Sequence, residues 1–208
     1  VVLLLHSLGI REAATFDWLD KPDPQAVERA ERLLTMLGAL HDADLTAIGR
    51  QMLRLPMHPR YSRMLIEASR RDCVPDAALC AALVSGRDLL TRGDRNDART
   101  QGTREMFEDS DDSDFITLMR AFDFAKSNRF SFERCRSHGI NAQVARQVDE
   151  TCKQILHAAH QQKLYDRKAA PTSSPKNDES LLRCLMAGFV DQLARRREPG
   201  KDACDLTE

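Results

Sequence analysis

The chain has 208 residues, of which 42% are hydrophobic and 30% are charged. These proportions are typical of a globular protein with room for one large domain or two small ones. The 31 basic and 32 acidic residues leave a formal net charge of -1. This balance argues against a free-standing nucleic-acid-binding module, because such modules usually carry a clear basic excess.

The N-terminal apolar run and the cysteines give information about the cellular location of the protein. Residues 1–5 are apolar, but the run is too short to cross a bilayer and lacks a basic leader, so we expect no membrane association. It resembles a helix cut in its middle, and position 1 is not Met, so we expect a fragment of a longer protein. The cysteines are scattered with no close pairing along the sequence, which fits a reduced cytoplasmic setting: Cys73, Cys80, Cys135, Cys152, Cys184 and Cys204.

Helix start and stop signals recur along the chain and strand patterns are nearly absent, so we predict a mainly α fold. Asp23 before Pro24 marks a helix start, and Gly38 suits the left-handed residue that ends a helix. Residues 39–40 and 45–46 flank a polar tetrapeptide and can form a short hairpin. Helices around such a hairpin are compatible with a small winged helix.

Residues 45–60 hold a helix, a stop and a second helix start. Thr46 can cap the first helix, Pro56 forbids its continuation, and Pro59 suits the first turn of the next one. That next helix is expected to end near residue 72 and to pair Arg63 with Glu67, four residues apart. Residues 77–84 are apolar on nearly every side, which predicts a helix buried in the centre of a bundle.

The second half contains further helices on either side of irregular stretches. Residues 87–112 lack periodicity and include an acidic run, so we predict a long exposed loop. We expect a helix from residue 113 or 114, another one before residue 139 that holds two phenylalanines, and the longest from residue 141. Residues 169–178 are predicted to be a linker before a last helix over residues 179–187. Helical spacing favours a core role over base stacking for Phe115, Phe122, Phe130 and Phe132.

Several patches, in this order along the chain, resemble DEAH-box RNA helicases of the bacterial type. Residues 45–60, LTAIGRQMLRLPMHPR, resemble the junction "LT-x-LGR-x-M-x-x-LP-x-HPR" between the winged-helix and ratchet domains of that family. Residues 8–22, 34–40, 81–88 and 183–197 are similar to further patches of it. Lys21 departs from the family's usual residue.

The resemblance implies a mainly α architecture, with a small winged helix followed by a helical-bundle ratchet domain and the start of a truncated OB-fold region. The expected boundaries are 1–57 for the N-terminally truncated winged helix, 58–165 for the ratchet (helicase-associated) domain, 166–178 for a linker and 179–208 for the OB-fold region. It also implies a parent that hydrolyses ATP, with Mg, in two RecA-like domains. This segment would then be an accessory part of the single-stranded RNA channel, coupled to the RecA motor.

The sequence itself contains no phosphate loop and no Asp-Glu-Ala-His. At its Gly-Lys pair, Gly200–Lys201, Arg195 stands in place of the first glycine of a phosphate loop and Asp202 in place of Ser or Thr. We therefore expect no catalytic residue and no cofactor site in this chain, and no ATP hydrolysis by the fragment alone. Whether the whole protein is an enzyme depends on the implied parent.

A metal site is the main chemical alternative. Cys135 and His138 lie three residues apart, and Cys152, His157 and His160 follow on one predicted helix. Zinc sites usually need two tight ligand pairs that converge. Cys152 falls on the apolar stripe of its helix, so we expect a core cysteine and no metal site.

The candidate phosphate contacts lie at the start of the first ratchet helix and around the two helices after the loop: Arg60, Arg63, Lys126, Arg129, Arg134 and Arg136. Each can hold a phosphate oxygen by a charge-assisted hydrogen bond, and each can equally be an ordinary exposed cation or a partner of Asp123 or Glu133. The expected partners are single-stranded RNA, the RecA-like and OB-fold domains of the same chain, and an adaptor protein. The alternative function is a protein-interaction module that docks an adaptor without contacting RNA.

Overall fold

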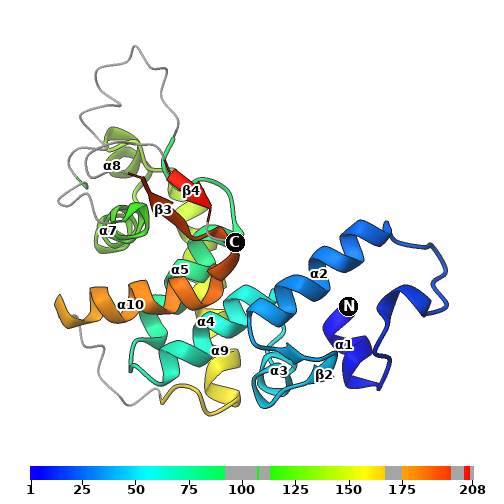
Figure 1. Cartoon of the computed structure of the whole chain (residues 1–208). Coiled ribbons are helices and arrows are strands. Elements are labelled where there is room, and N and C mark those ends of the chain that lie inside the picture. The colour runs from blue at the N-terminus through cyan, green and yellow to red at the C-terminus, as the bar shows by residue number, and fades with distance from the viewer. Residues whose placement is uncertain (92–106, 108–112, 167–174, 198–203, 207–208) are drawn as a thin grey trace. The chain divides into compact units, whose positions relative to one another are not determined.

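The computed structural model describes residues 1–91, 107, 113–166, 175–197 and 204–206 (Figure 1). The fold is mainly α, as predicted. The chain divides into two compact units, one formed by Val1–Ala77 with Ala158–Glu208 and the other by Ala78–His157. The predicted domain boundaries remain predictions.

The first unit begins with helices around a small hairpin. Its elements are α1 (Val2–Ser7), the 3-10 turn η1 (Ala13–Thr15), α2 (Pro24–Met36), β1 (Leu40–His41), β2 (Asp44–Leu45) and α3 (Ala47–Leu53). The Asp23 carboxylate accepts a hydrogen bond from the Gln25 N–H, and Gly38 has a φ of +71°, so the predicted start and end signals are confirmed. The antiparallel pairing of Leu40 with Leu45 confirms the hairpin.

Helix α3 packs closely against the hairpin. The Thr46 hydroxyl accepts a hydrogen bond from the Gly49 N–H at 3.0 Å, which confirms the predicted cap. A Cβ at Gly49 would lie 2.3 Å from the Ala39 carbonyl oxygen, so only glycine fits there. The core around this contact contains Leu3, Leu34, Leu37, Ala39, Leu40, Met52, Leu55 and Ile66.

The rest of the first unit is built on α4 (Pro59–Ser69) and α10 (Pro175–Gly188), which pack against each other (Figure 1). Helix α4 ends three residues before the expected position, because the chain turns and Asp72 takes a left-handed φ of +54°. Helix α10 begins at Pro175 rather than at residue 179. A proline suits the first helical turn, so the predicted linker is helical at its C-terminal end.

Shorter elements follow α10. The 3-10 turn η2 (Val190–Gln192) leads into β3 (Ala194–Arg196), which pairs antiparallel with β4 (Cys204–Leu206). Close contact between α4 and α10 depends on Gly188, because a Cβ at this position would lie 2.9 Å from the Arg60 carbonyl oxygen.

The second unit contains most of α5 (Val74–Ser85) together with α7 (Asp114–Ser127), α8 (Phe132–Ser137) and most of α9 (Ala142–Gln161). Residues 77–83 of α5 are all buried, as predicted, but Val84, the last residue of the predicted buried stretch, is 39% exposed. Ser113 caps α7 through its hydroxyl, and the Asn141 side chain accepts hydrogen bonds from the N–H groups of Gln143 and Val144. These helix starts are the predicted ones.

The prediction that residues 87–112 form an exposed loop is confirmed at Arg87, Asp88 and Thr91 but wrong at the other described positions. Leu89 is buried, Leu90 forms a β-bridge with Ile140, and Phe107 is only 5% exposed. The Phe107 ring lies 5.8 Å from that of Phe124, measured between centroids. The acidic run at residues 108–112 lies outside the described residues. Tertiary packing thus buries apolar side chains that have no helical or strand period.

The core prediction for the four phenylalanines is also partly wrong. Phe122 is buried, but Phe132 is 68% exposed. Arg129 and Phe130 both take a left-handed φ of +54°, so Phe130 lies in a turn before α8 and the helical spacing is interrupted there. The buried residues of α7 are Thr117, Ala121, Phe122 and Ala125, so Phe115 is not among them.

Candidate nucleic-acid interface

Arg60 makes contacts within the first unit. Its guanidinium forms a two-pronged ion pair with Asp191, in which the Nη2–Oδ2 distance is 2.6 Å, and it lies 5.6 Å from the centroid of the Phe189 ring. The Arg60 side chain is only 15% exposed. The hydrogen bond from Arg60 lowers the pKa of Asp191 below its usual range. The ion pair links the start of α4 to the segment after α10. The Arg60 guanidinium N–H groups that would bind a phosphate oxygen already donate to Asp191.

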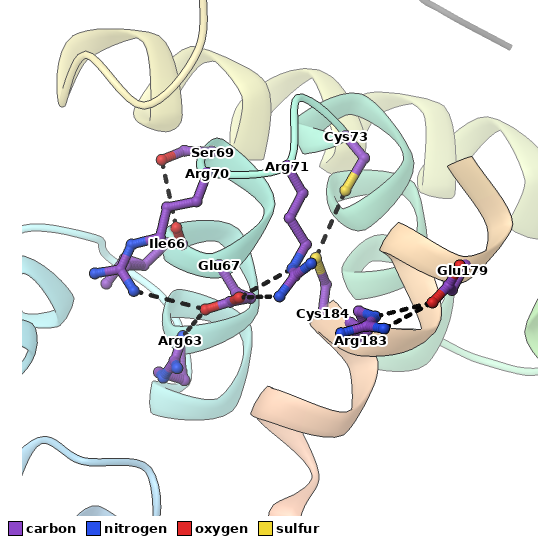
Figure 2. Close-up of polar contacts among 10 residues, drawn as sticks. All are labelled: Arg63, Ile66, Glu67, Ser69, Arg70, Arg71, Cys73, Glu179, Arg183 and Cys184. Carbon is purple, nitrogen blue, oxygen red and sulfur yellow. Dashed lines mark hydrogen bonds and ion pairs between the residues drawn. The ribbon is translucent and has the colours of Figure 1, made fainter. Parts of the chain in front are cut away.

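Arg63 is also paired, as Figure 2 shows. The Glu67 carboxylate accepts hydrogen bonds from Arg63 at 3.1 Å and from Arg71 at 2.9 Å, and Arg70 lies 3.7 Å away. Burial acts to raise the pKa of Glu67, but the hydrogen bonds from Arg63 and Arg71 outweigh it and lower the pKa. The predicted pairing of Arg63 with Glu67 is confirmed, and Glu67 binds three arginines on one side of α4.

The candidate cations of the second unit are more exposed to solvent than Arg60 and Arg63. The Lys126 ammonium lies 3.4 Å from Asp149, which also pairs with Lys153 at 2.5 Å, and the Lys126 side chain stays mostly exposed. The exposed Arg134 donates a hydrogen bond to the Asn128 side-chain oxygen at 2.6 Å. This hydrogen bond uses one of the N–H groups of the Arg134 guanidinium.

Arg129 and Arg136 differ from the other four candidates. Both are exposed, and within the described residues neither side chain has a hydrogen bond or an ion pair. Phe132 and Arg136 are four residues apart on α8 and therefore lie on the same side of the helix. Arg129 lies in the turn that precedes this helix. The α8 edge, defined here as Arg129, Phe132 and Arg136, thus combines an exposed aromatic ring with two cations that have no partner in the described part of the chain.

Sequence reasoning considered Phe132 for base stacking but favoured a core position. The signal that could have corrected this is Asn128, a residue type that often follows the last turn of a helix. A helix end there separates Phe130 and Phe132 from the spacing of α7.

The structure gives no support to the metal alternative. Among the described residues, no group of three or more His, Cys, Asp or Glu side chains could hold a metal ion. Cys135 is buried, and the His138 ring stacks on Phe124 with 4.3 Å between centroids. In the same described part of the chain, no helix is long and apolar enough to span a membrane.

The cysteines are scattered along the sequence, but two of them meet in the structure. Cys73 and Cys184 bring their sulfur atoms to 3.5 Å, although 111 residues separate them in sequence. The prediction of no close pairing therefore applies to the sequence but not to the fold. Five cysteines whose side chains are described carry free thiols: Cys73, Cys80, Cys135, Cys152 and Cys184.

Comparison with known proteins places this chain among helicase C-terminal regions. Residues 30–57 match the family model of the helicase-associated domain (HA2), winged-helix, and residues 58–118 match that of the helicase-associated domain (HA2), ratchet-like. The chain is 30% identical over 197 residues to the pre-mRNA-splicing factor ATP-dependent RNA helicase prp22 of Schizosaccharomyces pombe. That alignment covers 94% of this chain but only 16% of the relative. Residues 30–118 thus match the two helicase-associated (HA2) domains, and the chain is similar to the C-terminal region of a DEAH-box helicase.

Proposed function

We propose that this chain forms part of the single-stranded RNA channel of an ATP-dependent RNA helicase and that the α8 edge contacts the RNA. The proposal depends on the solvent exposure of the three side chains of this edge. Arg129 and Arg136 have no partner within the described residues, and Phe132, on the same helix as Arg136, is 68% exposed. Guanidinium groups bind phosphate oxygens, and an exposed aromatic ring can stack on a base of any sequence.

The geometry suits a single strand. One helical turn separates Phe132 from Arg136, so the ring and one cation can contact neighbouring parts of the same nucleotide chain. Phosphate contacts of this kind fix the position of the strand without reading its sequence. The net charge of -1 fits such a local contact, because the rest of the surface supplies no general attraction for RNA.

The same contacts narrow the set of predicted RNA-binding residues. Arg60 and Arg63 are paired and mostly buried, so we assign them to the packing of α4. Lys126 and Arg134 stay exposed and can add to the attraction near the α8 edge.

We further propose that the chain acts with domains that it does not contain. RecA-like motor domains would bind ATP and Mg, since this sequence lacks a phosphate loop, and an OB-fold domain would complete the channel. The 20-residue α9 would serve as a rigid rail along which motor movements are transmitted. Free thiols at the five cysteines whose side chains are described fit a reducing cytoplasmic setting.

The test is a double substitution, Arg129→Ala with Arg136→Ala, in the full-length helicase. We expect weaker binding of single-stranded RNA and a salt dependence reduced by about 1.4 in log–log slope, because each lost phosphate contact removes about 0.7. The matched control is Arg32→Ala with Arg54→Ala, which removes two exposed arginines of the first unit. This control should leave both quantities near wild type.

The competing function is docking of an adaptor protein without RNA contact. Photo-crosslinking of single-stranded RNA to the full-length protein separates the two. Adducts on α7, α8 or α9 support the channel, whereas bound adaptor without adducts, together with unchanged RNA affinity of the double variant, would reject it.

A further inference from the structure

The two meeting cysteines lie on elements that hold them in place. Cys73 directly precedes α5, and its N–H donates to the Ala68 carbonyl oxygen at 3.1 Å. Cys184 lies in α10, between the buried Leu181 and Leu185. Both thiols are fully buried, and Figure 2 shows their side chains pointing toward each other from the two elements.

The distance between the sulfur atoms is short enough for a bond after a small movement. A disulfide needs a separation of about 2.05 Å, so the atoms must approach by about 1.5 Å from their present 3.5 Å. Rotation of the two side chains can supply part of this movement. We propose that Cys73 and Cys184 are a modification site, at which a peroxide converts the two thiols into a reversible disulfide.

The hydrogen bond between the two thiols favours Cys73 as the first thiol to react. The hydrogen bond from Cys184 lowers the pKa of Cys73. Burial and the nearby Asp76 carboxylate oppose this effect, and the smaller influences of Arg71, which lowers the pKa, and Asp72, which raises it, act in opposite directions. The same hydrogen bond, together with burial, raises the pKa of Cys184. The thiolate is the reactive form of cysteine, so Cys73 is the nucleophile and Cys184 the resolving thiol.

The reaction balances with hydrogen peroxide as the oxidant. The Cys73 thiolate attacks one peroxide oxygen, the O–O bond breaks, and Cys73 becomes a sulfenic acid while the released hydroxide takes up the thiol proton as water. The Cys184 sulfur then attacks the Cys73 sulfur and the S–O bond breaks. The Cys184 proton leaves with the hydroxide as a second water, so two thiols are oxidised and one peroxide is reduced. A dithiol reductant reverses the bond by exchange.

The bond would change how α10 is held. In the reduced chain, α10 stays on α4 through packing and the Arg60–Asp191 ion pair. A disulfide would add a covalent link between positions 111 residues apart and would enclose the whole second unit in one covalent ring. Such a link restricts the unfolded chain and prevents α10 from separating from α4.

The decisive experiment is peptide mapping of the full-length protein. After treatment with hydrogen peroxide, free thiols are blocked with an alkylating agent in denaturant and the digest is analysed without reduction. We expect the peptides of Cys73 and Cys184 to be joined and the link to disappear with dithiothreitol. Cys80 and Cys135, which are as deeply buried as the reacting pair, should remain alkylated. Separate alkylation of Cys73 and Cys184, or their oxidation to sulfonic acids without a link, would overturn the proposal.

A stability measurement provides a second readout. The urea midpoint of unfolding should rise on oxidation in the wild type and in the control Cys135→Ala, but not in Cys184→Ala. If the midpoint rises equally in Cys184→Ala, another reaction is responsible and the assignment fails. Should Cys184→Ala not fold, mapping of the wild type alone decides the question. Neither readout involves RNA, so the outcome is independent of the proposed channel function.

Discussion

The arginines of α4 and those around α8 are of the same residue type, yet the structure uses them differently. On α4, Arg60 and Arg63 each bind a carboxylate with most of the side chain buried. Around α8, Arg129 and Arg136 stay exposed, with no partner within the described residues. The comparison shows that an arginine becomes available to a ligand only where the fold supplies no competing carboxylate.

A physical reason underlies the difference. Helix α4 packs against α10 and needs its polar edges satisfied, because a buried charge without a partner is strongly unfavourable. Helix α8 exposes Phe132 and Arg136, so water solvates these side chains until a ligand replaces it. If this distinction is correct, substitutions on the α4 side should cost stability, and substitutions at the α8 edge should cost binding.

The largest effect is expected for Asp191→Ala. This change leaves the Arg60 guanidinium mostly buried without its carboxylate, and it should lower the free energy of unfolding by about 2–3 kcal/mol. Urea denaturation measures the loss. The control is Asp44→Ala, which removes the partner of Arg11 in a pair whose side chains are 63% and 65% exposed. It should change stability by less than about 0.5 kcal/mol, and equal losses in the two variants would contradict the comparison.

A somewhat smaller effect is expected for Gly188→Ala. The new Cβ would lie 2.9 Å from the Arg60 carbonyl oxygen and 3.3 Å from the Met64 Cβ, so α10 must shift away from α4 at a cost of about 1–2 kcal/mol. Thermal unfolding of the variant checks this. Gly86→Ala is the matched control, because its Cβ would meet nothing closer than 3.8 Å. An unchanged melting temperature for Gly188→Ala would show that the contact with α4 is looser than described.

Glu67→Gln should cost about 1 kcal/mol at neutral pH, because the charged partner of Arg63 and Arg71 is lost. The lowered pKa of Glu67 also predicts a dependence on pH. The Glu67 carboxylate stabilises the folded protein fully at pH values above the pKa of an unfolded glutamate, about 4.3. This stabilisation is lost as the pH falls through the lower pKa that Glu67 has in the folded protein. Urea midpoints between neutral and acidic pH should therefore fall less steeply in Glu67→Gln than in wild type. The exposed Glu28→Gln serves as control and should keep the wild-type slope.

The smallest effect on stability is expected for Phe132→Ala, within about 0.5 kcal/mol, because the ring is mostly exposed. Binding of single-stranded RNA by the full-length helicase should nevertheless weaken by about 1 kcal/mol, the low end for loss of a stacked base. Leu8→Ala, which truncates another well-exposed apolar side chain, is the control and should leave RNA affinity unchanged. A large loss of stability in Phe132→Ala with normal RNA affinity would place the ring in the core instead.

Local signals in the sequence identified most helix starts correctly. Asp23, Thr46, Ser113 and Asn141 each cap the helix that follows, because a cap needs only a side-chain oxygen and N–H groups two or three residues away. The candidate site was predictable only in part. The sequence indicated which arginines were candidates, but it could not show which of them meet a carboxylate, since Arg60 and Asp191 are 131 residues apart.

From the sequence alone followed the mainly α class, the resemblance to helicases and the local helix signals, because all of these depend on residue types at short spacing. Only the tertiary structure decided that Phe107 is buried and Phe132 exposed, that Arg60 is paired whereas Arg129 has no partner among the described residues, and that Cys73 meets Cys184. Burial and long-range pairing depend on which surfaces the folded helices bring together. Short-range patterns contain no information about those contacts.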